Sequence, residues 1–231
     1  MRMSQSVSCP RCGTARHTWS ETHDLCPSCL LTTALSLEGE PCPYRVLTPI
    51  GESLGAVTYL AQAPFPFRGY VALKMLRPRT DVEAVLSRYQ HWKSPLARLR
   101  HPSIARLLDV GLTEEGLVYV ASEYVAGWSL TSMSPRHREA VPVETAVEAA
   151  MERIDRGEIV RQLTDAVHAA HAAGVAHLKL DATKVRISTA NGLHATILGF
   201  GSSLIVDGAD VRTEQDLAAL AQLASDLDIE P

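Results

Sequence analysis

The stretch HLKLDATKVRI (residues 177–187) joins a predicted helix to a predicted β-hairpin. The segment before it, EIVRQLTDAVHAAHAAG (158–174), has helical spacing and ends at Gly174. Its shared apolar face consists of Ile159, Leu163, Val167 and Ala170. Within the stretch, a basic residue, Lys179, stands two positions before an acidic one, Asp181. This order of charges fits an active site, a degenerate one or a coincidence, and the surrounding segments discriminate among them.

Short β-strands are predicted on both sides of this helix. KVRIS (184–188) and LHATILGF (193–200) flank Asn191-Gly192, a dipeptide typical of the type I′ turn of a hairpin. Five earlier segments read as strands, the first three as a meander: YRVLTPI (44–50), AVTYLAQA (56–63), GYVALKML (69–76), IARLLDVGL (104–112) and GLVYVASEYV (116–125). The fourth and fifth are separated by a predicted turn at residues 114–116.

Two further segments have helical periodicity. DVEAVLSRYQHWKSPLARL (81–99) is predicted as a helix that Pro95 kinks or ends late. TEQDLAALAQLASDL (213–227) begins with a capping pattern and continues as an apolar helix. Residues 129–158 are polar and irregular, which predicts a loop with some helix. Strands and helices together therefore indicate an α+β fold.

The composition bounds the class of protein. The 231 residues are 46% hydrophobic and 21% charged, with a net charge of −4, as in soluble globular proteins. No overall basic field attracts nucleic acid or anionic lipid. No apolar run reaches the roughly 18 residues that a membrane span needs, and the N-terminus lacks the apolar region of a secretory signal. We therefore expect a cytoplasmic protein with neither nucleic acid nor a membrane as partner.

Four of the five cysteines form two CxxC pairs, Cys9 with Cys12 and Cys26 with Cys29. Each pair presents two thiolates from one tight turn, and a tetrahedral Zn²⁺ needs four ligands. Paired cysteines in a reducing compartment usually bind metal. The sequence therefore predicts a structural zinc ribbon, because a closed four-cysteine site leaves no open position for catalysis.

Alternatives to this zinc site remain open at the level of the sequence. The four cysteines could form two disulfides or stay unrelated thiols, and His17 or His23 could replace one ligand. Cys42 stands alone and is interpreted as a small residue without a metal. The ribbon has too few basic residues for a phosphate-binding surface. Contact with a protein, or capping of the next domain, is the expected role.

The order of motifs from residue 44 to about residue 226 resembles the eukaryotic-like protein kinases, most closely their bacterial serine/threonine branch. VALK (71–74) is similar to the Val-Ala-Ile-Lys strand of the family, and LRHPSIARLLDVG (99–111) to the segment leading to its fourth strand. EYVAGWSL (123–130) resembles the hinge, and ILGFG (197–201) the Asp-Phe-Gly segment with its preceding strand. Asp216 matches the aspartate that opens the central helix of the lower lobe.

The resemblance implies where a nucleotide would bind. Lys74 would hold the phosphates, and Gly51 would begin the glycine-rich loop. The hinge residues Glu123 and Val125 would contact the base, with Ser122 at the gatekeeper position. His177 would be structural, since in this family it packs under the catalytic loop.

At the catalytic positions the chain departs from the family. Aligned on His177, the residue in place of the catalytic aspartate is Lys179, whose ammonium group cannot accept a proton at neutral pH. The asparagine that binds magnesium is replaced by Lys184, and the aspartate of Asp-Phe-Gly by Gly199. Asp181 replaces the lysine of the loop. Asp207 lies too far along the chain to take the place of Gly199, because only Gly199 correctly follows the hairpin.

Other parts of the family pattern also differ. Ser53 and Ala56 replace two glycines of the loop that approaches phosphate closely. Trp92 occupies the position of the glutamate that pairs with the strand lysine. Only 15 residues separate Gly201 from Asp216, without an Ala-Pro-Glu motif, and the later lower-lobe helices are expected to be absent.

The cysteine pairs predict a zinc ribbon (1–35), the polar segment with Gly and Pro after it predicts a linker (36–43), and the resemblance implies a two-lobed kinase-like domain (44–231). Its five-stranded upper lobe would span about residues 44–124, and its truncated, mainly helical lower lobe about residues 125–231. The expected function is that of a pseudokinase, a binding or regulatory module without catalysis. The alternatives are an atypical, weakly active kinase and a non-functional remnant; a nucleic-acid-binding ribbon protein is a further one.

Ligands and partners follow from the same changes. We expect structural zinc and neither ATP nor Mg²⁺. Metal-independent binding of a polyphosphate by Lys74, Lys179 and Lys184 remains the alternative. Because the helix at 213–227 would lose its usual cover, we expect a protein partner or a homodimer to contact the apolar side of that helix, through Leu217, Leu220 and Leu223.

Overall fold

The computed structural model describes residues 43–64, 69–77, 80–113, 115–133, 154–190 and 192–227. The proposed zinc ligands Cys9, Cys12, Cys26 and Cys29, together with the predicted linker, lie outside the described residues. The chain divides into two compact units. The first comprises residues up to 80 together with 111–120, and the second comprises 81–110 together with the residues from 121 onward.

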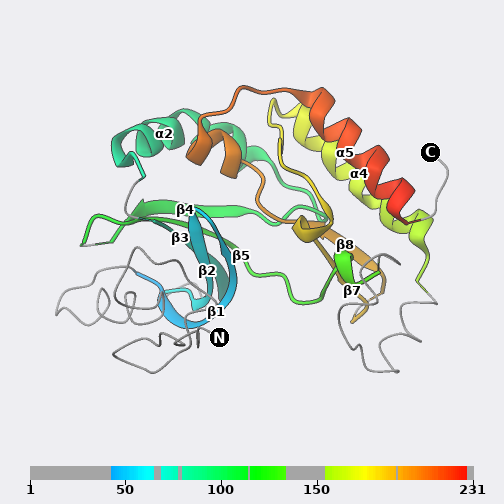
Figure 1. The fold of residues 1–231 in the computed structure, drawn as a ribbon, viewed down its shortest axis with the longest axis horizontal. Helices are drawn as coiled ribbons and strands as arrows, with labels where there is room; N and C mark the ends of the chain where they lie inside the picture. Colours follow the sequence, from blue (N-terminus) through cyan, green and yellow to red (C-terminus); the bar gives the residue numbers. More distant parts are fainter. Residues whose placement is uncertain are drawn as a thin grey trace, which may run out of the picture. The chain divides into compact units, whose positions relative to one another are not determined.

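A five-stranded sheet forms from the five segments that were predicted as strands, as Figure 1 shows. The strands are β1 (Arg45–Ser53), β2 (Ala56–Gln62), β3 (Tyr70–Leu76), β4 (Leu107–Leu112) and β5 (Val118–Glu123), in the order β1-β2-β3-β5-β4. Both neighbouring pairs within β1-β2-β3 are antiparallel, which confirms the predicted meander.

Alternation along β2 and β3 creates the apolar face of this sheet in the first unit. Tyr59 pairs with Leu73, and Ala61 with Val71; all four are buried. Lys74, the next residue after Leu73, points to the opposite face, because successive side chains in a strand alternate. The sequence period of two therefore decides which side of the sheet carries the lysine.

Helix α2 (Val82–Arg98) begins the second unit. The side chain of Asp81 caps it by accepting a hydrogen bond from the backbone N–H of Ala84 at 3.0 Å. The helix contains Pro95 and continues three residues beyond it to Arg98, so the proline does not end the helix where it stands. The sequence predicted that residues 44–124, including α2, belong to the upper lobe, but α2 belongs to the second unit. This difference arises because α2 packs on residues near 203–207 of the same unit.

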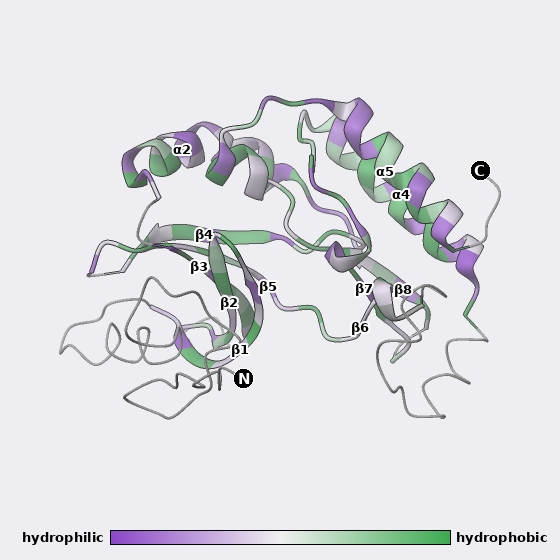
Figure 2. Cartoon of the chain, viewed as in Figure 1, coloured by the Kyte–Doolittle hydropathy of each residue, from purple (hydrophilic) through white to green (hydrophobic). Residues whose placement is uncertain are grey.

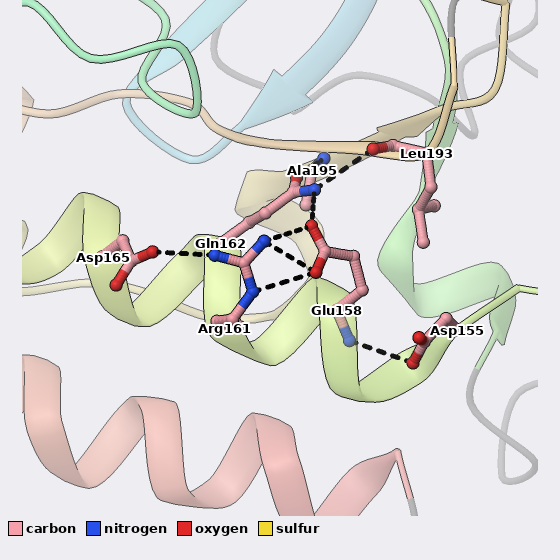
Figure 3. Close-up of polar contacts among 7 residues, drawn as sticks. All are labelled: Asp155, Glu158, Arg161, Gln162, Asp165, Leu193 and Ala195. Atoms are coloured by element: carbon pink, nitrogen blue, oxygen red, sulfur yellow. Dashed lines mark hydrogen bonds and ion pairs between the residues drawn. The ribbon is translucent and has the colours of Figure 1, made fainter.

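Helix α4 (Arg156–Ala172) confirms the predicted amphipathic helix. Its four predicted face residues are all fully buried, and Gly174 has a φ of +76° directly after the helix. Figure 3 shows the polar side of its first turns, where the Asp155 carboxylate caps the N–H of Glu158. Gln162 binds the strand β8 region through both ends of its amide: it donates to Leu193 O at 3.1 Å and accepts from Ala195 N at 2.8 Å.

The second unit also contains a small antiparallel sheet in the order β6-β7-β8. Its strands are β6 (Trp128–Ser129), β7 (Val185–Ser188) and β8 (His194–Ile197). The last two confirm the predicted hairpin strands. Short helical turns are η2 (Leu130–Met133), η4 (Ala182–Lys184) and η5 (Ser203–Asp207), of which η5 is a π-helical turn.

Helix α5 (Thr213–Asp226) lies beside α4 in Figure 1. Figure 2 shows hydrophobic and hydrophilic residues interspersed around both helices, as expected where each buries one face. Leu220 and Leu223 are buried in this packing, with exposed fractions of 7% and 3%. Their predicted exposure is therefore wrong, because α4 covers this side of α5; Leu217 alone of the three is exposed, at 46%.

The predicted capping pattern at the start of α5 is also not formed. The N-cap residue is Arg212, and it makes no side-chain capping hydrogen bond. Asp216 is fully buried. Its carboxylate accepts hydrogen bonds from the backbone of His177 and Leu178 instead of capping α5.

Candidate functional site

The carboxylate of Asp216 organises the loop that follows α4. Its Oδ2 accepts the backbone N–H of His177 at 2.7 Å, and its Oδ1 accepts that of Leu178 at 2.7 Å. The ring Nε2 of His171, in the last turn of α4, lies 2.9 Å from Oδ2. Leu178 has a φ of +68°, a conformation that is costly for a branched residue. The buried carboxylate therefore holds the loop in a strained conformation.

His177 is a structural residue, as the resemblance implied. It is buried, and its ring packs edge-to-face on Phe200 with centroids 5.0 Å apart. Its Nε2 lies 2.9 Å from Leu198 O, and its Nδ1 accepts the N–H of Lys179 at 3.3 Å. A neutral ring with the proton on Nε2 satisfies both contacts. Burial lowers the pKa of His177, although the hydrogen bond to Leu198 and the charge of Asp216 oppose this shift.

Lys179, which the resemblance assigns to the position of the catalytic base, forms an ion pair. Lys179 Nζ lies 2.8 Å from Asp207 Oδ2, at the end of η5. Both side chains are exposed, with 63% and 41% of their surface accessible. Asp207 therefore reaches the loop and pairs with Lys179. Its spacing in the sequence had excluded it as a replacement for Gly199.

The remaining charged residues of the loop form a local turn. The Asp181 carboxylate caps η4 by accepting the N–H of Thr183 at 2.7 Å and its hydroxyl. Lys184 Nζ lies 3.2 Å from the same hydroxyl oxygen. The carboxylate of Asp181, which replaces the lysine of the loop, is thus occupied by capping the turn.

Gly199 begins a segment that is held firmly within the second unit. Its φ is +89°, and an added Cβ would meet only His177 Nε2, at 3.9 Å. The position thus has room for a side chain but has none. Farther along, Arg88 of α2 donates from Nε to Ile205 O at 2.8 Å and from Nη2 to Val206 O at 3.0 Å. A guanidinium group is favourable at the carbonyl end of a helical turn such as η5.

The hinge candidates lie at the end of β5. Glu123 binds Arg106 through both its main chain and its carboxylate: its N–H donates to Arg106 O at 2.9 Å, and its Oε2 accepts the N–H of Arg106 at 3.0 Å. Val125 is half-buried and makes no hydrogen bond to another described residue. Gly127 has a φ of +139°, and a Cβ there would lie 2.3 Å from Ile187 O. Only glycine allows this approach to β7.

Lys74 and Gly51 belong to the first unit, whereas Lys179, Lys184 and Gly199 belong to the second. Lys74 is half-buried and pairs in register with Thr58. Gly51 does not have a positive φ, so its backbone does not demand glycine. Between β1 and β2, Leu54 is 98% exposed.

Arg186 was not selected from the sequence. In β7 it stands between two fully buried residues, Val185 and Ile187, on the opposite face of the strand. Its Nη1 is buried without a hydrogen-bond partner among the described residues. The available sequence signal was a single charge inside a short apolar strand.

Metal sites and membrane spans were also sought in the described ranges. No group of three or more His, Cys, Asp or Glu residues there is arranged to hold a metal ion. None of the described helices has the length and apolar character needed to cross a bilayer.

Comparison with known proteins identifies related sequences, although no family model matches the chain. The serine/threonine-protein kinase pkn3 of Myxococcus xanthus is 30% identical over 174 residues, which are 72% of this chain and 29% of that protein. A probable serine/threonine-protein kinase PknB of Lactococcus lactis is 26% identical over 162 residues, 70% of this chain and 24% of that protein. The chain therefore spans less than a third of the length of these curated relatives.

A solved structure has the same fold. The PknI kinase domain of Mycobacterium tuberculosis matches with a TM-score of 0.58 and 28% identity, over 81% of this chain and 74% of that domain. The fold of the solved domain and the sequences of the relatives agree with one another. The chain belongs to the bacterial eukaryotic-like serine/threonine protein kinase family.

Proposed function

We propose that this protein is a catalytically inactive member of the kinase family that acts as a binding or regulatory module. The observation that carries the proposal is the pair between Lys179 and Asp207. A base in phosphoryl transfer must accept or orient the proton of the substrate hydroxyl. A protonated lysine has no lone pair for this, and its carboxylate partner is neutralised by the same contact.

Loss of the magnesium ligands supports the same conclusion. Lys184 carries a positive charge where an amide oxygen would bind the metal, and Gly199 has no side chain. Magnesium supplies much of the charge neutralisation in phosphoryl transfer. Trp92, in place of the expected glutamate, is half-buried rather than in the core, and it contacts the ring of His91 edge-to-face at 5.1 Å.

A weakly active kinase is the second candidate, and Asp207 is the observation that favours it. This carboxylate is the only one bonded to Lys179 in the described part of the chain. A metal that displaced Lys179 would find one oxygen ligand there. Against this, a hard divalent cation such as Mg²⁺ usually binds one or two carboxylates together with phosphates and waters.

The test compares the parent protein with the triple variant Lys179→Asp, Lys184→Asn, Gly199→Asp. Phosphate transfer from ATP to a generic substrate protein is measured with Mg²⁺ and with Mn²⁺, and metal-dependent thermal shifts are measured alongside. We expect no transfer by the parent and a Mg²⁺-dependent thermal shift only in the triple variant. Transfer by the parent that is lost in Asp207→Asn would establish the second candidate instead.

The zinc site is proposed separately, because its cysteines lie outside the described residues. We propose that Cys9, Cys12, Cys26 and Cys29 bind one structural Zn²⁺. The four thiolates in two CxxC pairs support this site. Metal analysis of the purified protein tests it, with Cys42→Ala as the matched control: zinc content should fall in Cys12→Ala and stay unchanged in Cys42→Ala.

A protein partner at Leu217 is the remaining proposal from the sequence. This side chain is exposed on α5, whereas Leu220 and Leu223 are buried. A single exposed leucine is common on soluble proteins and makes a small patch. Light scattering of the parent and of Leu217→Glu tests whether the residue supports an assembly.

A further inference from the structure

A hollow of about 400 Å³ opens on the surface of the second unit, and Glu123 of the hinge is one of the residues that line it. It is lined by Arg100, His101, Pro102, Ile104, Arg106 and Glu123. Five of these six follow one another closely in the segment between α2 and β4. We infer that this hollow is a docking site for an acidic peptide segment of a partner protein.

The charges of the lining residues select a carboxylate. Arg106 is neutralised by Glu123, with Nη2 and Oε1 2.5 Å apart. Arg100 is exposed and has no ion-pair partner among the described residues. The two arginines and Glu123 together give the hollow a net charge of about +1, which complements a single carboxylate. A phosphate dianion would leave a negative charge uncompensated beside Glu123.

The ring of His101 and the main chain that leads to Arg100 are held in place before any ligand binds. His101 Nδ1 accepts the N–H of Ser103 at 3.1 Å, so the proton of the neutral ring is on Nε2, which can donate to a ligand. Arg100 follows directly after Leu99, whose N–H bonds back to the last turn of α2 at Pro95 O and Leu96 O. Preorganised donors reduce the entropy that is lost on binding.

The wall and floor of the hollow are equally fixed. Arg106 and Glu123 are joined by two main-chain and side-chain contacts besides their ion pair, which bind the start of β4 to the end of β5. Ile104 is buried and bridges to Ile197 of β8, and His194 Nε2 lies 3.0 Å from Pro102 O. The hollow can therefore receive two side chains of a peptide: an acidic one at Arg100 and an apolar one at the exposed Pro102.

A protein partner is favoured over nucleic acid because the excess charge is small. Binding a nucleic acid backbone needs several phosphate contacts from Lys or Arg. Here only Arg100 is uncompensated, and the whole chain has a net charge of −4. A single arginine is instead well suited to bidentate recognition of one carboxylate.

The experiment measures fluorescence anisotropy of short labelled peptides with the full chain. Three peptide probes have the same length and alternate Leu with one other residue, which is Glu, Gln or phosphoserine. The fourth probe is a labelled single-stranded oligonucleotide. The variants are Arg100→Ala, Glu123→Gln and, as matched control, Arg98→Ala. Arg98 is exposed two residues before Arg100 and does not line the hollow. Circular dichroism verifies that each variant is folded.

We expect the Glu peptide to bind and the Gln peptide to bind at least about tenfold more weakly. Arg100→Ala should weaken binding of the Glu peptide about tenfold, whereas Arg98→Ala should change it less than about twofold. Glu123→Gln, which removes the negative charge but keeps an oxygen acceptor, should strengthen it about two- to fivefold.

Several results would overturn the inference. These are equal binding of the Gln peptide, equal effects of Arg98→Ala and Arg100→Ala, or tighter binding of the phosphoserine peptide or the oligonucleotide. Absence of binding to every probe would also overturn it. Failure of this proposal would leave the proposed loss of catalysis untouched, because Arg98 and Arg100 are not candidate catalytic or nucleotide-binding residues. Glu123 is a hinge candidate, so its variant is compared by peptide binding alone.

Discussion

The buried support of the loop at 177–184 and its exposed tip behave differently. The support consists of Asp216, His177 and Phe200, which are buried and joined by short hydrogen bonds and a ring contact. The tip consists of Lys179 and Asp181, whose side chains are exposed; Lys179 pairs with Asp207, and Asp181 caps the turn that follows it. The motifs that carry the family resemblance include Asp216 and His177 of the support, whereas the expected departures from the family lie at the tip.

This difference shows that the conformation of the loop and its chemistry rest on separate residues. A buried carboxylate that accepts two backbone N–H groups cannot be replaced without leaving donors unsatisfied. An exposed side chain at the tip can change from aspartate to lysine, since water solvates either one. The conformation of the loop therefore places no requirement on the side chain at position 179.

The largest effect is expected from removing the centre of the support. Asp216→Ala should lower the free energy of unfolding by about 3–5 kcal/mol, because it leaves the N–H groups of His177 and Leu178 unsatisfied in the interior. Denaturant unfolding followed by circular dichroism measures this. Asp226→Ala in the same helix is the control, since its carboxylate accepts only from Gln222 at the surface, and it should cost less than about 1 kcal/mol. Equal losses in both variants would mean that the buried carboxylate is not the support.

Gly127→Ala should have the second-largest effect. An added Cβ would lie 2.3 Å from Ile187 O, so the main chain between the hinge and β7 must move. We expect a loss of about 2–3 kcal/mol. Gly192→Ala is the matched control: it also has a positive φ, of +95°, but open space around the added Cβ. Its loss should reflect backbone strain alone, about 1 kcal/mol. Thermal unfolding that ranks Gly192→Ala as the worse variant would contradict this account.

The third prediction concerns pH and His177. Burial lowers the pKa of this histidine in the folded chain below its ordinary value of 6.5. Below that value the unfolded chain binds a proton at His177 that the folded chain does not bind, so the stability should fall as the pH decreases. This contribution is fully present above 6.5 and is lost toward the lower, folded pKa.

Urea unfolding of the parent and of His177→Gln between about pH 5.5 and 7.5 isolates this contribution from the other titrating groups. The glutamine can still donate to Leu198 O, but it does not titrate. The parent should lose more stability than the variant as the pH falls. Parallel curves would show that the His177 ring does not have a lowered pKa.

The smallest effect is expected at the tip. Lys179→Ala should change the free energy of unfolding by no more than about 1 kcal/mol, because the pair with Asp207 is exposed to water. A double-mutant cycle with Asp207→Ala measures the coupling between the two residues, and added salt should reduce it. A coupling as large as the loss in Asp216→Ala would remove the distinction between support and tip.

Most of the fold was predictable because its signals are local. Strands β1 to β5, the hairpin β7–β8 and helices α2, α4 and α5 follow from residue spacing, with Gly174 ending α4 as expected. The identities at Lys179, Lys184 and Gly199 are local as well. Whether a side chain can accept a proton or bind a metal depends first on its residue type, which the sequence gives directly.

The contacts of the charged residues were not predictable, because they depend on which segments meet. Asp216 reads as part of a helix-capping pattern in the sequence, and only the packing of α5 against α4 turns it into the support of the loop at His177. Asp207 was excluded by its spacing as a metal ligand, and only the turn η5 brings it to Lys179. Burial of Leu220 and Leu223 likewise depends on the neighbouring helix.

The sequence by itself determined the family resemblance, the order of elements and the residue types at positions 179, 184 and 199, since these are properties of residue type and spacing. Only the tertiary structure decided the pairing of Lys179 with Asp207, the burial of the α5 leucines and the hollow around Arg100. The physical reason is that pairing and burial are set by distances between residues far apart in the chain. Neither periodicity nor composition contains those distances.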